Sequence, residues 1–224
     1  MGLTEVLCGD RALLGAGWAE LVQDVRRTLH ERARQAADLG IVLAIEDHQD
    51  FGSQELLEFA AEAGTNVGIC LDTGNPLAVG EEPLAFTRKV APLVRHVHLK
   101  DYRAQWTGEG YRLIRCAIGE GTVLFREVAR ILDEHHAEMT ASIEIGALEA
   151  RHIRLFKSEW WMGYPHRLAA ELGPCLAVAW TRHLEETEDC RTPWESEASG
   201  REVEDYEMGQ LQRSVAYLKG LGFM

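Results

Sequence analysis

The chain has 224 residues, of which 46% are apolar and 26% charged, and its formal net charge is −13. This composition is ordinary for a globular protein of one or two domains, and the negative charge argues against nucleic-acid binding, which requires clustered Lys and Arg. The five cysteines are scattered without a CxxC pair, no apolar run has membrane-spanning length, and Met1 is not followed by a signal segment. We therefore expect a cytoplasmic protein with reduced thiols that binds neither nucleic acid nor membrane.

Helix and strand patterns alternate along the chain. Apolar residues at spacings of three and four predict a first helix over 18–39, which precedes the apolar run IVLAIE. A second helix is predicted to start with Ser53 as its N-cap and to end at Gly64, before the run VGICLD. Pro83 is placed for the first turn of a third helix, ahead of VRHVHL, and a fourth helix over 125–132 precedes MTASIE. Nearly continuous apolar strands that alternate with helices indicate an α/β fold with a parallel sheet.

The pattern changes from about residue 150, where helical stretches are predicted near 166–187 and 203–220. We divide the chain into an α/β part at 1–150 and a helical, acidic C-terminal extension at 151–224. Ten acidic and two basic residues lie between positions 185 and 207. Such a block is typical of a solvated linker and helix surface, and the alternative is a subunit-contact or lid segment.

The four apolar runs share one feature, which is a residue at or near the end of each run that can bind a divalent metal. These residues are Glu46, Asp72, His98 and Glu144, at spacings of 26, 26 and 46 residues. A strand, a helix and two loops take about 30 residues, so the spacings fit successive βα units. The carboxyl ends of parallel strands lie along one rim, so the four side chains can converge there. The oxygen and nitrogen donors suit one ion of Mn²⁺, Mg²⁺, Co²⁺ or Zn²⁺.

Each of these residues has a plain structural alternative. A carboxylate after a strand is most often solvated or caps a helix, and Asp72 with the following Thr-Gly-Asn could form a turn. His96 and His98 alternate on one strand and therefore point to the same face. We expect His98 to bind metal and His96 to be a hydrogen-bonded core histidine.

A cationic segment follows this strand, with its basic residues at Lys100, Arg103, Arg112 and Arg115. We interpret it as a loop over the rim that could hold a substrate carboxylate or phosphate. The alternative is a set of surface salt bridges.

The ordered motifs IEDHQD, CLDTGN, HVHLKD, AIGEG and SIEIG, over about residues 10–150, resemble the xylose isomerase-like TIM barrel superfamily in its sugar phosphate isomerase and epimerase branch. In that family Glu, Asp, His and Glu from the last four barrel strands hold the metal, which implies the four residues that the spacing indicates. The resemblance also implies that Glu46 and Glu144 exchange the substrate proton as catalytic residues. The candidate substrate-binding residues are Asn75, His48, Lys100 and Arg103.

Three positions depart from the best-known ketose epimerases. Asn75 replaces a substrate-binding His, Gly52 replaces a Glu, and Ala104 replaces an Arg, although Arg103 is adjacent. These departures disfavour epimerisation of free ketohexoses. The same superfamily includes inosose dehydratases, hydroxypyruvate isomerases and decarboxylases of oxidised branched sugars.

The N-terminal part is too short for a complete barrel. A closed barrel needs eight strands, and the ligand strands correspond to the last four. Ahead of Glu46 there is room for one helix and the short segment LTEVL. We therefore expect a TIM-type barrel that is N-terminally truncated to its last four to five βα units, or one that pairs with a second copy as a homo-oligomer.

The functional hypothesis is a divalent-metal-dependent isomerase or epimerase that acts on a carbohydrate, namely a sugar, sugar acid or cyclitol, through an enediolate. Two alternatives stay open. One is a metal-dependent lyase, a decarboxylase or dehydratase of an oxidised sugar. The other is a non-catalytic truncated barrel.

Overall fold

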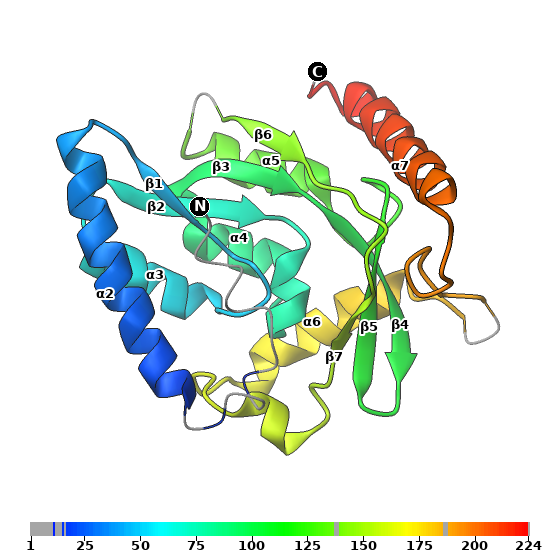
Figure 1. Ribbon diagram of the computed structural model, residues 1–224, viewed down its shortest axis with the longest axis horizontal. Coiled ribbons are helices and arrows are strands. Elements are labelled where there is room, and N and C mark those ends of the chain that lie inside the picture. The colour runs from blue at the N-terminus through cyan, green and yellow to red at the C-terminus, as the bar shows by residue number, and fades with distance from the viewer. Residues whose placement is uncertain (1–10, 12–14, 16, 137–138, 186–187, 224) are drawn as a thin grey trace.

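A four-stranded parallel sheet forms the centre of the molecule in the computed structural model, which describes residues 11, 15, 17–136, 139–185 and 188–223 (Figure 1). The strand order is β1-β2-β3-β6. The strands are β1 Leu43–Glu46, β2 Val67–Asp72, β3 Val94–Leu99 and β6 Ala141–Ile143. The predicted α/β class and parallel sheet are confirmed.

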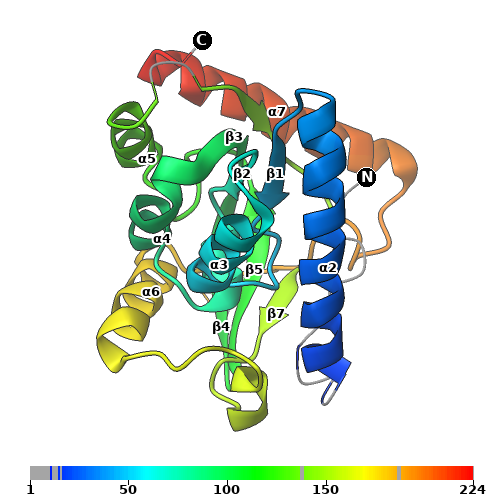
Figure 2. The ribbon, with the colours of Figure 1, turned by 90° about the vertical axis from the view of Figure 1, so that its left-hand side faces the viewer.

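Helices cover one face of this sheet. They are α2 Gly17–Asp38, α3 Ser53–Ala63, α4 Pro83–Val90 and α5 Phe125–Asp133. Figure 2 shows α3, α4 and α5 side by side in front of the strands, with α2 beside α3 near the β1 edge. Alternate strand residues such as Ile69, Leu71 and Val97 point to the helices and join the main apolar core. The intervening residues therefore point to the opposite face.

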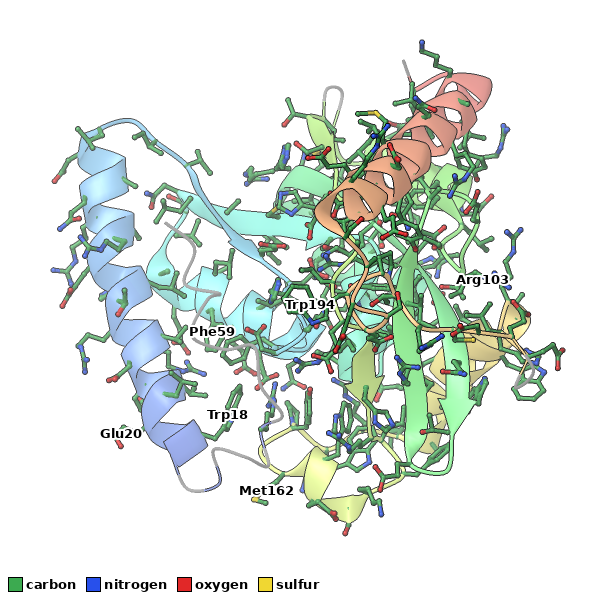
Figure 3. All side chains as sticks on the ribbon, turned by 45° about the vertical axis from the view of Figure 1, so that its right-hand side comes forward. Trp18, Glu20, Phe59, Arg103, Met162 and Trp194 are labelled. Atoms are coloured by element: carbon green, nitrogen blue, oxygen red, sulfur yellow. The ribbon has the colours of Figure 1, made fainter. Side chains whose placement is uncertain are left out.

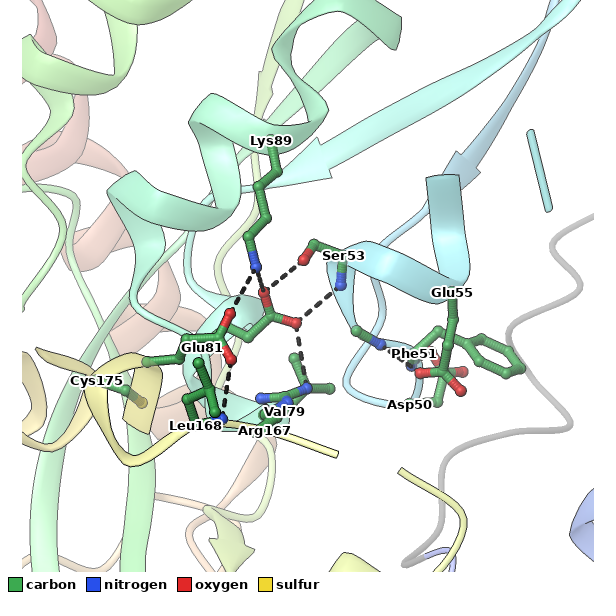
Figure 4. A network of polar contacts seen from close by, with 12 residues as sticks. Asp50, Phe51, Ser53, Glu55, Val79, Glu81, Lys89, Arg167, Leu168 and Cys175 are labelled. Atoms are coloured by element: carbon green, nitrogen blue, oxygen red, sulfur yellow. Dashed lines mark hydrogen bonds and ion pairs between the residues drawn. The ribbon is translucent and has the colours of Figure 1, made fainter. Parts of the chain in front are cut away.

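The second predicted helix starts differently from expectation. Its N-cap is Gly52, and Ser53 is the first helical residue. The Ser53 hydroxyl and backbone N–H donate to the two oxygens of Glu81, at 2.6 and 2.9 Å. Glu81 also pairs with Lys89 and Arg167, as Figure 4 shows. This buried network fastens the chain near residue 167 to the start of α3.

The predicted cationic loop is wrong, because this segment forms a β-hairpin. β4 Asp101–Thr107 and β5 Gly110–Cys116 pair antiparallel around a turn at positions 108 and 109, and β7 Arg151–Ile153 pairs with β5. Buried Tyr102 and Ala104 alternate with half-buried Arg103 along β4. This alternation is typical of a strand covered on one face. The many charged residues in the segment make the alternation difficult to detect in the sequence.

The C-terminal part holds both predicted helices, as α6 Ala169–Thr181 and α7 Gly200–Leu221. It is not wholly helical, because β7 also belongs to it. Leu218 of α7 is buried in the main core, and the Ser214 hydroxyl accepts a hydrogen bond from the backbone N–H of Ile118 at 2.9 Å. The division near residue 150 stays a prediction.

The four parallel strands leave two sheet edges. Among the described residues, no strand pairs with the outer side of β1 or of β6, so these strands do not close into a barrel. The segment LTEVL lies outside the described residues. No described helix combines the length and apolar character needed to cross a membrane.

Candidate metal centre

The four predicted metal ligands meet at one point. Glu46 and Asp72 are the last residues of β1 and β2, His98 is in β3, and Glu144 directly follows β6. One ligand atom from each residue lies within 4.8 Å of the others. Strand pairing brings them there, because Asp72 lies opposite His98, whereas Glu46 lies opposite Cys70 and Ser142 lies opposite His98. Each glutamate is thus offset by two positions, and an even offset keeps its side chain on the same face of the sheet.

His98 lies between the two glutamates. Its Nδ1 is 3.1 Å from Glu46 Oε1 and 3.2 Å from Glu144 Oε2. His96 lies on the same face, with its ring edge-on to that of His98 at 5.4 Å. Both ring nitrogens of His96 are occupied by hydroxyl groups, since Nδ1 is 2.7 Å from Thr140 Oγ1 and Nε2 is 3.1 Å from Ser142 Oγ. The shared face of the two histidines is confirmed, and His96 is hydrogen-bonded as expected. It is half-buried and not in the core, so that part of the prediction is wrong.

A buried lysine lies beside the carboxylates. Lys100 Nζ is 2.6 Å from Asp72 Oδ2 and 2.6 Å from Glu144 Oε1, and the Lys100 and Asp72 side chains are fully buried. Although burial disfavours the charged ammonium, the Asp72 carboxylate raises the pKa of Lys100. Burial raises the pKa of Asp72 to about 6, and the Lys100 charge opposes this rise. Burial likewise opposes ionisation of Glu144, but Lys100 and Arg115 outweigh it and lower its pKa.

The residues fit a divalent cation. Three carboxylates and one imidazole offer the mixed oxygen and nitrogen donors that Mg²⁺, Mn²⁺, Co²⁺ or Zn²⁺ accept. Asp72 Oδ2 is buried, and its close partner among the described residues is the Lys100 ammonium. A buried carboxylate oxygen with unused acceptor capacity is a suitable ligand atom. The backbone N–H groups of Gly74 and Asn75 hold Oδ1 at 3.0 and 3.3 Å, which fixes the carboxylate.

The predicted substrate-binding residues are divided by the structure. Lys100 lies in the centre, beside Glu144. Half-buried His48 lies within the electrostatic influence of Glu46 and Glu144, and burial lowers its pKa. Arg103 lies elsewhere, on the outer side of β4 (Figure 3), where its guanidinium is 3.7 Å from Glu188.

Asn75 takes part in a polar group that the sequence analysis did not identify. Its Oδ1 accepts hydrogen bonds from Gln49 Nε2 and from the Tyr102 hydroxyl, both at 3.3 Å. Tyr102 lies opposite Arg115 across the hairpin, and the Arg115 guanidinium is 3.9 Å from Glu144 Oε1. Tyr102 and Arg115 are cross-strand partners in the hairpin, so the hairpin register would have revealed them.

Asp101 fixes the hairpin base next to the centre. Its carboxylate accepts four backbone N–H groups, with donor distances of 2.9 to 3.0 Å, from Tyr102, Gly119, Gly121 and Val123. This one side chain therefore holds the loop after β5 against the start of β4, and with it the position of neighbouring Lys100.

The chain is similar to known proteins over part of their length. It is 30% identical over 127 residues to an inosose dehydratase of Clostridium beijerinckii, covering 49% of this chain and 42% of that protein. It is 35% identical over 81 residues to inosose dehydratase 1 of Bacillus cereus, covering 34% and 27%. The chain thus spans less than half the length of these curated relatives. A Mycobacterium smegmatis xylose isomerase-like TIM barrel protein, solved in complex with magnesium, superposes with a TM-score of 0.46 at 19% identity, covering 72% of this chain and 47% of that one.

A family model settles the wider relationship. The model described as xylose isomerase-like TIM barrel matches residues 6–158, which include all four candidate metal ligands. The chain belongs to the xylose isomerase-like TIM barrel family.

Proposed function

We propose that this chain acts as a divalent-metal-dependent lyase, of the dehydratase type, on a polyhydroxylated carbonyl compound such as a sugar or cyclitol. The observation that carries the proposal is the cluster of Glu46, Asp72, His98 and Glu144, with ligand atoms within 4.8 Å of one another. Similarity to two inosose dehydratases supports loss of water over the isomerase or epimerase reaction expected from the sequence.

The cluster would hold the ion, and a bound divalent cation would polarise the substrate carbonyl.

The two glutamates have different surroundings. Glu144 has Lys100 at 2.6 Å and Arg115 at 3.9 Å, two cations that favour its ionised form. Glu46 contacts His98 at 3.1 Å and has no Lys or Arg partner among the described residues. We therefore assign the proton transfer to Glu46 and the role of a fixed ligand to Glu144.

In the proposed reaction one carboxylate, that of Glu46, acts first as the base and then as the acid. Glu46 takes the proton from the carbon next to the carbonyl, and the electron pair of that C–H bond forms a C=C bond as the hydroxyl on the next carbon leaves. The protonated Glu46 gives its proton to the departing hydroxyl, so that water is released and the carboxylate is restored. Half-buried His48 is the candidate for binding another hydroxyl group of the substrate. Lys100 and Asn75 are buried, so their proposed role is to position Glu144 and Tyr102 rather than to contact the substrate.

Metal binding tests the foundation of this proposal. Elemental analysis of the purified, dialysed chain should give about one equivalent of divalent metal, because the four ligands form a single cluster. Glu144→Gln should lose it, since an amide is neutral and a poorer ligand. Glu149→Gln is the matched control, because Glu149 is exposed and lies outside the cluster. No metal in any form of the chain would refute the proposal.

Product analysis separates the lyase from its alternatives. The metal-loaded chain is incubated with keto-cyclitols and keto-sugars, and products are followed by mass and by the absorbance of the conjugated carbonyl. A dehydratase gives a product lighter by one water molecule. An isomerase or epimerase gives a product of unchanged mass in H₂O and exchanges one carbon-bound hydrogen for deuterium in D₂O. Metal binding without turnover on the whole panel would favour the non-catalytic alternative.

A further inference from the structure

The hairpin carries three arginines, and two of them are already paired away from the metal cluster. Arg103 contacts Glu188 at 3.7 Å. Arg112 donates to Gln105 at 2.7 Å and forms a close ion pair with Glu195. These two guanidinium groups hold the hairpin to the chain near residues 188–195, so they offer little to a ligand at the rim.

The third arginine, Arg115, faces the cluster. Its guanidinium lies against Gly146, two residues after Glu144, where a Cβ atom would come within 2.7 Å of Nη1. Its single ion pair among the described residues is the 3.9 Å contact with Glu144 Oε1. That oxygen also has Lys100 Nζ at 2.6 Å, so Arg115 is the more distant of its two cationic neighbours.

Arg115 therefore has binding capacity that the chain does not use. A guanidinium presents five N–H donors in a planar fork, and the one ion pair that Arg115 makes among the described residues is long, at 3.9 Å. The Arg115 side chain is 19% exposed, so it is partly desolvated yet still reachable from the rim. A carboxylate matches the fork with two parallel hydrogen bonds, whereas a neutral hydroxyl group does not compensate its charge.

We propose that Arg115 binds the carboxylate of an anionic substrate, so that the substrate class is a sugar acid or cyclitol acid. This inference rests on the proposed function, because it assumes that the substrate occupies the rim beside the metal cluster. Tyr102 positions the guanidinium from the neighbouring strand, and Gly146 leaves it the room to lie there. The substrate carboxylate then lies on the hairpin side of Glu144.

The test compares an acid with its neutral amide on the Mn²⁺-loaded chain. D-glucuronate and D-gluconate are titrated beside D-glucuronamide and D-gluconamide by calorimetry. The wild type should bind at least one acid about ten- to a hundredfold more tightly than its amide, as expected for a charge-assisted bidentate contact. Arg115→Gln should abolish this preference while amide binding stays within about twofold, and Arg115→Lys should restore part of it.

Two further variants separate the interpretations. Arg112 is on the same strand but pairs with Glu195, away from the cluster, so the Arg112→Gln variant should keep the acid preference. Gly146→Ala keeps every charge and displaces the Arg115 guanidinium, so it should weaken acid binding selectively. Equal loss of acid and amide binding in Arg115→Gln, or loss of Mn²⁺, would show that Arg115 merely positions Glu144 and would overturn the inference. A wild type that binds Mn²⁺ without preferring either acid refutes the inference alone, whereas a wild type without Mn²⁺ refutes the proposed function as well.

Discussion

Replacing Lys100 by Met tests whether a buried ammonium stabilises the cluster when metal is removed. Each of its two carboxylate contacts, at 2.6 Å, corresponds to about 6 kcal/mol of attraction at an effective dielectric constant of about 20. Desolvation offsets most of this sum, and removing one partner of a buried ion pair costs about 3–5 kcal/mol. The metal-free variant should therefore melt about 6–20 °C below the wild type in a chain of this size.

Added metal should reverse much of this loss. A divalent cation takes over the charge of the missing ammonium at Asp72 and Glu144, and saturation at about 100 times Kd stabilises a protein by about 2.7 kcal/mol. Thermal unfolding of the chelated and the Mg²⁺- or Mn²⁺-saturated forms measures both effects. The rise in Tm on adding metal should be larger for Lys100→Met than for the wild type, because the ammonium and the metal compete for the same oxygens.

The control is Lys89→Met. Lys89 is 45% exposed and lies 3.6 Å from both Glu81 and Glu171. Because buried Glu81 keeps Ser53 and Arg167 as partners, loss of the exposed ammonium should cost only about 0–1 kcal/mol. Equal stability of metal-free Lys100→Met and wild type would refute the reasoning about burial. A smaller metal effect in the variant would show instead that Lys100 organises the ligands rather than competing with the ion.

Two predictions concern parts of the fold outside the cluster. Burial raises the pKa of Asp50 from 3.8 to about 7. Protonation of Asp50 therefore contributes its full free energy of folding below about pH 4, and this contribution is lost as the pH rises through 7. Asp50→Asn should therefore be up to about 4 kcal/mol more stable than the wild type at pH 8 and about equal at pH 4, measured by urea unfolding; equal stability at both would contradict this. Leu218→Ala should cost about 2–5 kcal/mol in a single transition, and exposed Met208→Ala much less, because α7 packs into the main core; a separate transition for the C-terminal part would favour a domain boundary near residue 150.

Periodicity was sufficient to predict the ligand cluster. The strands are parallel, so the carboxyl ends that carry Glu46 and Asp72 fall on one rim, and the even offset between them keeps both side chains on one face. The sequence could not distinguish Arg103 from Arg115 in the same way, because both are arginines of one cationic segment. Their orientation depends on the hairpin register, which places Arg115 opposite Tyr102 and Arg103 opposite Ile114. A two-residue turn at positions 108 and 109 sets that register.

Two sheets thus contribute different chemistry to one rim. The parallel sheet supplies the ligand atoms, whose positions follow from strand order and are fixed by backbone pairing. The two cationic groups lie at the junction of the sheets and on the second sheet, since Lys100 links β3 to β4 and Arg115 is in β5. If both proposals hold, a change on β5 should alter which substrate charge is accepted without moving a metal ligand, whereas a change at the end of a parallel strand should remove the ion itself. For this reason the acid preference and the metal content are independent measurements on the same variants, and their separation would show that substrate choice resides in the hairpin.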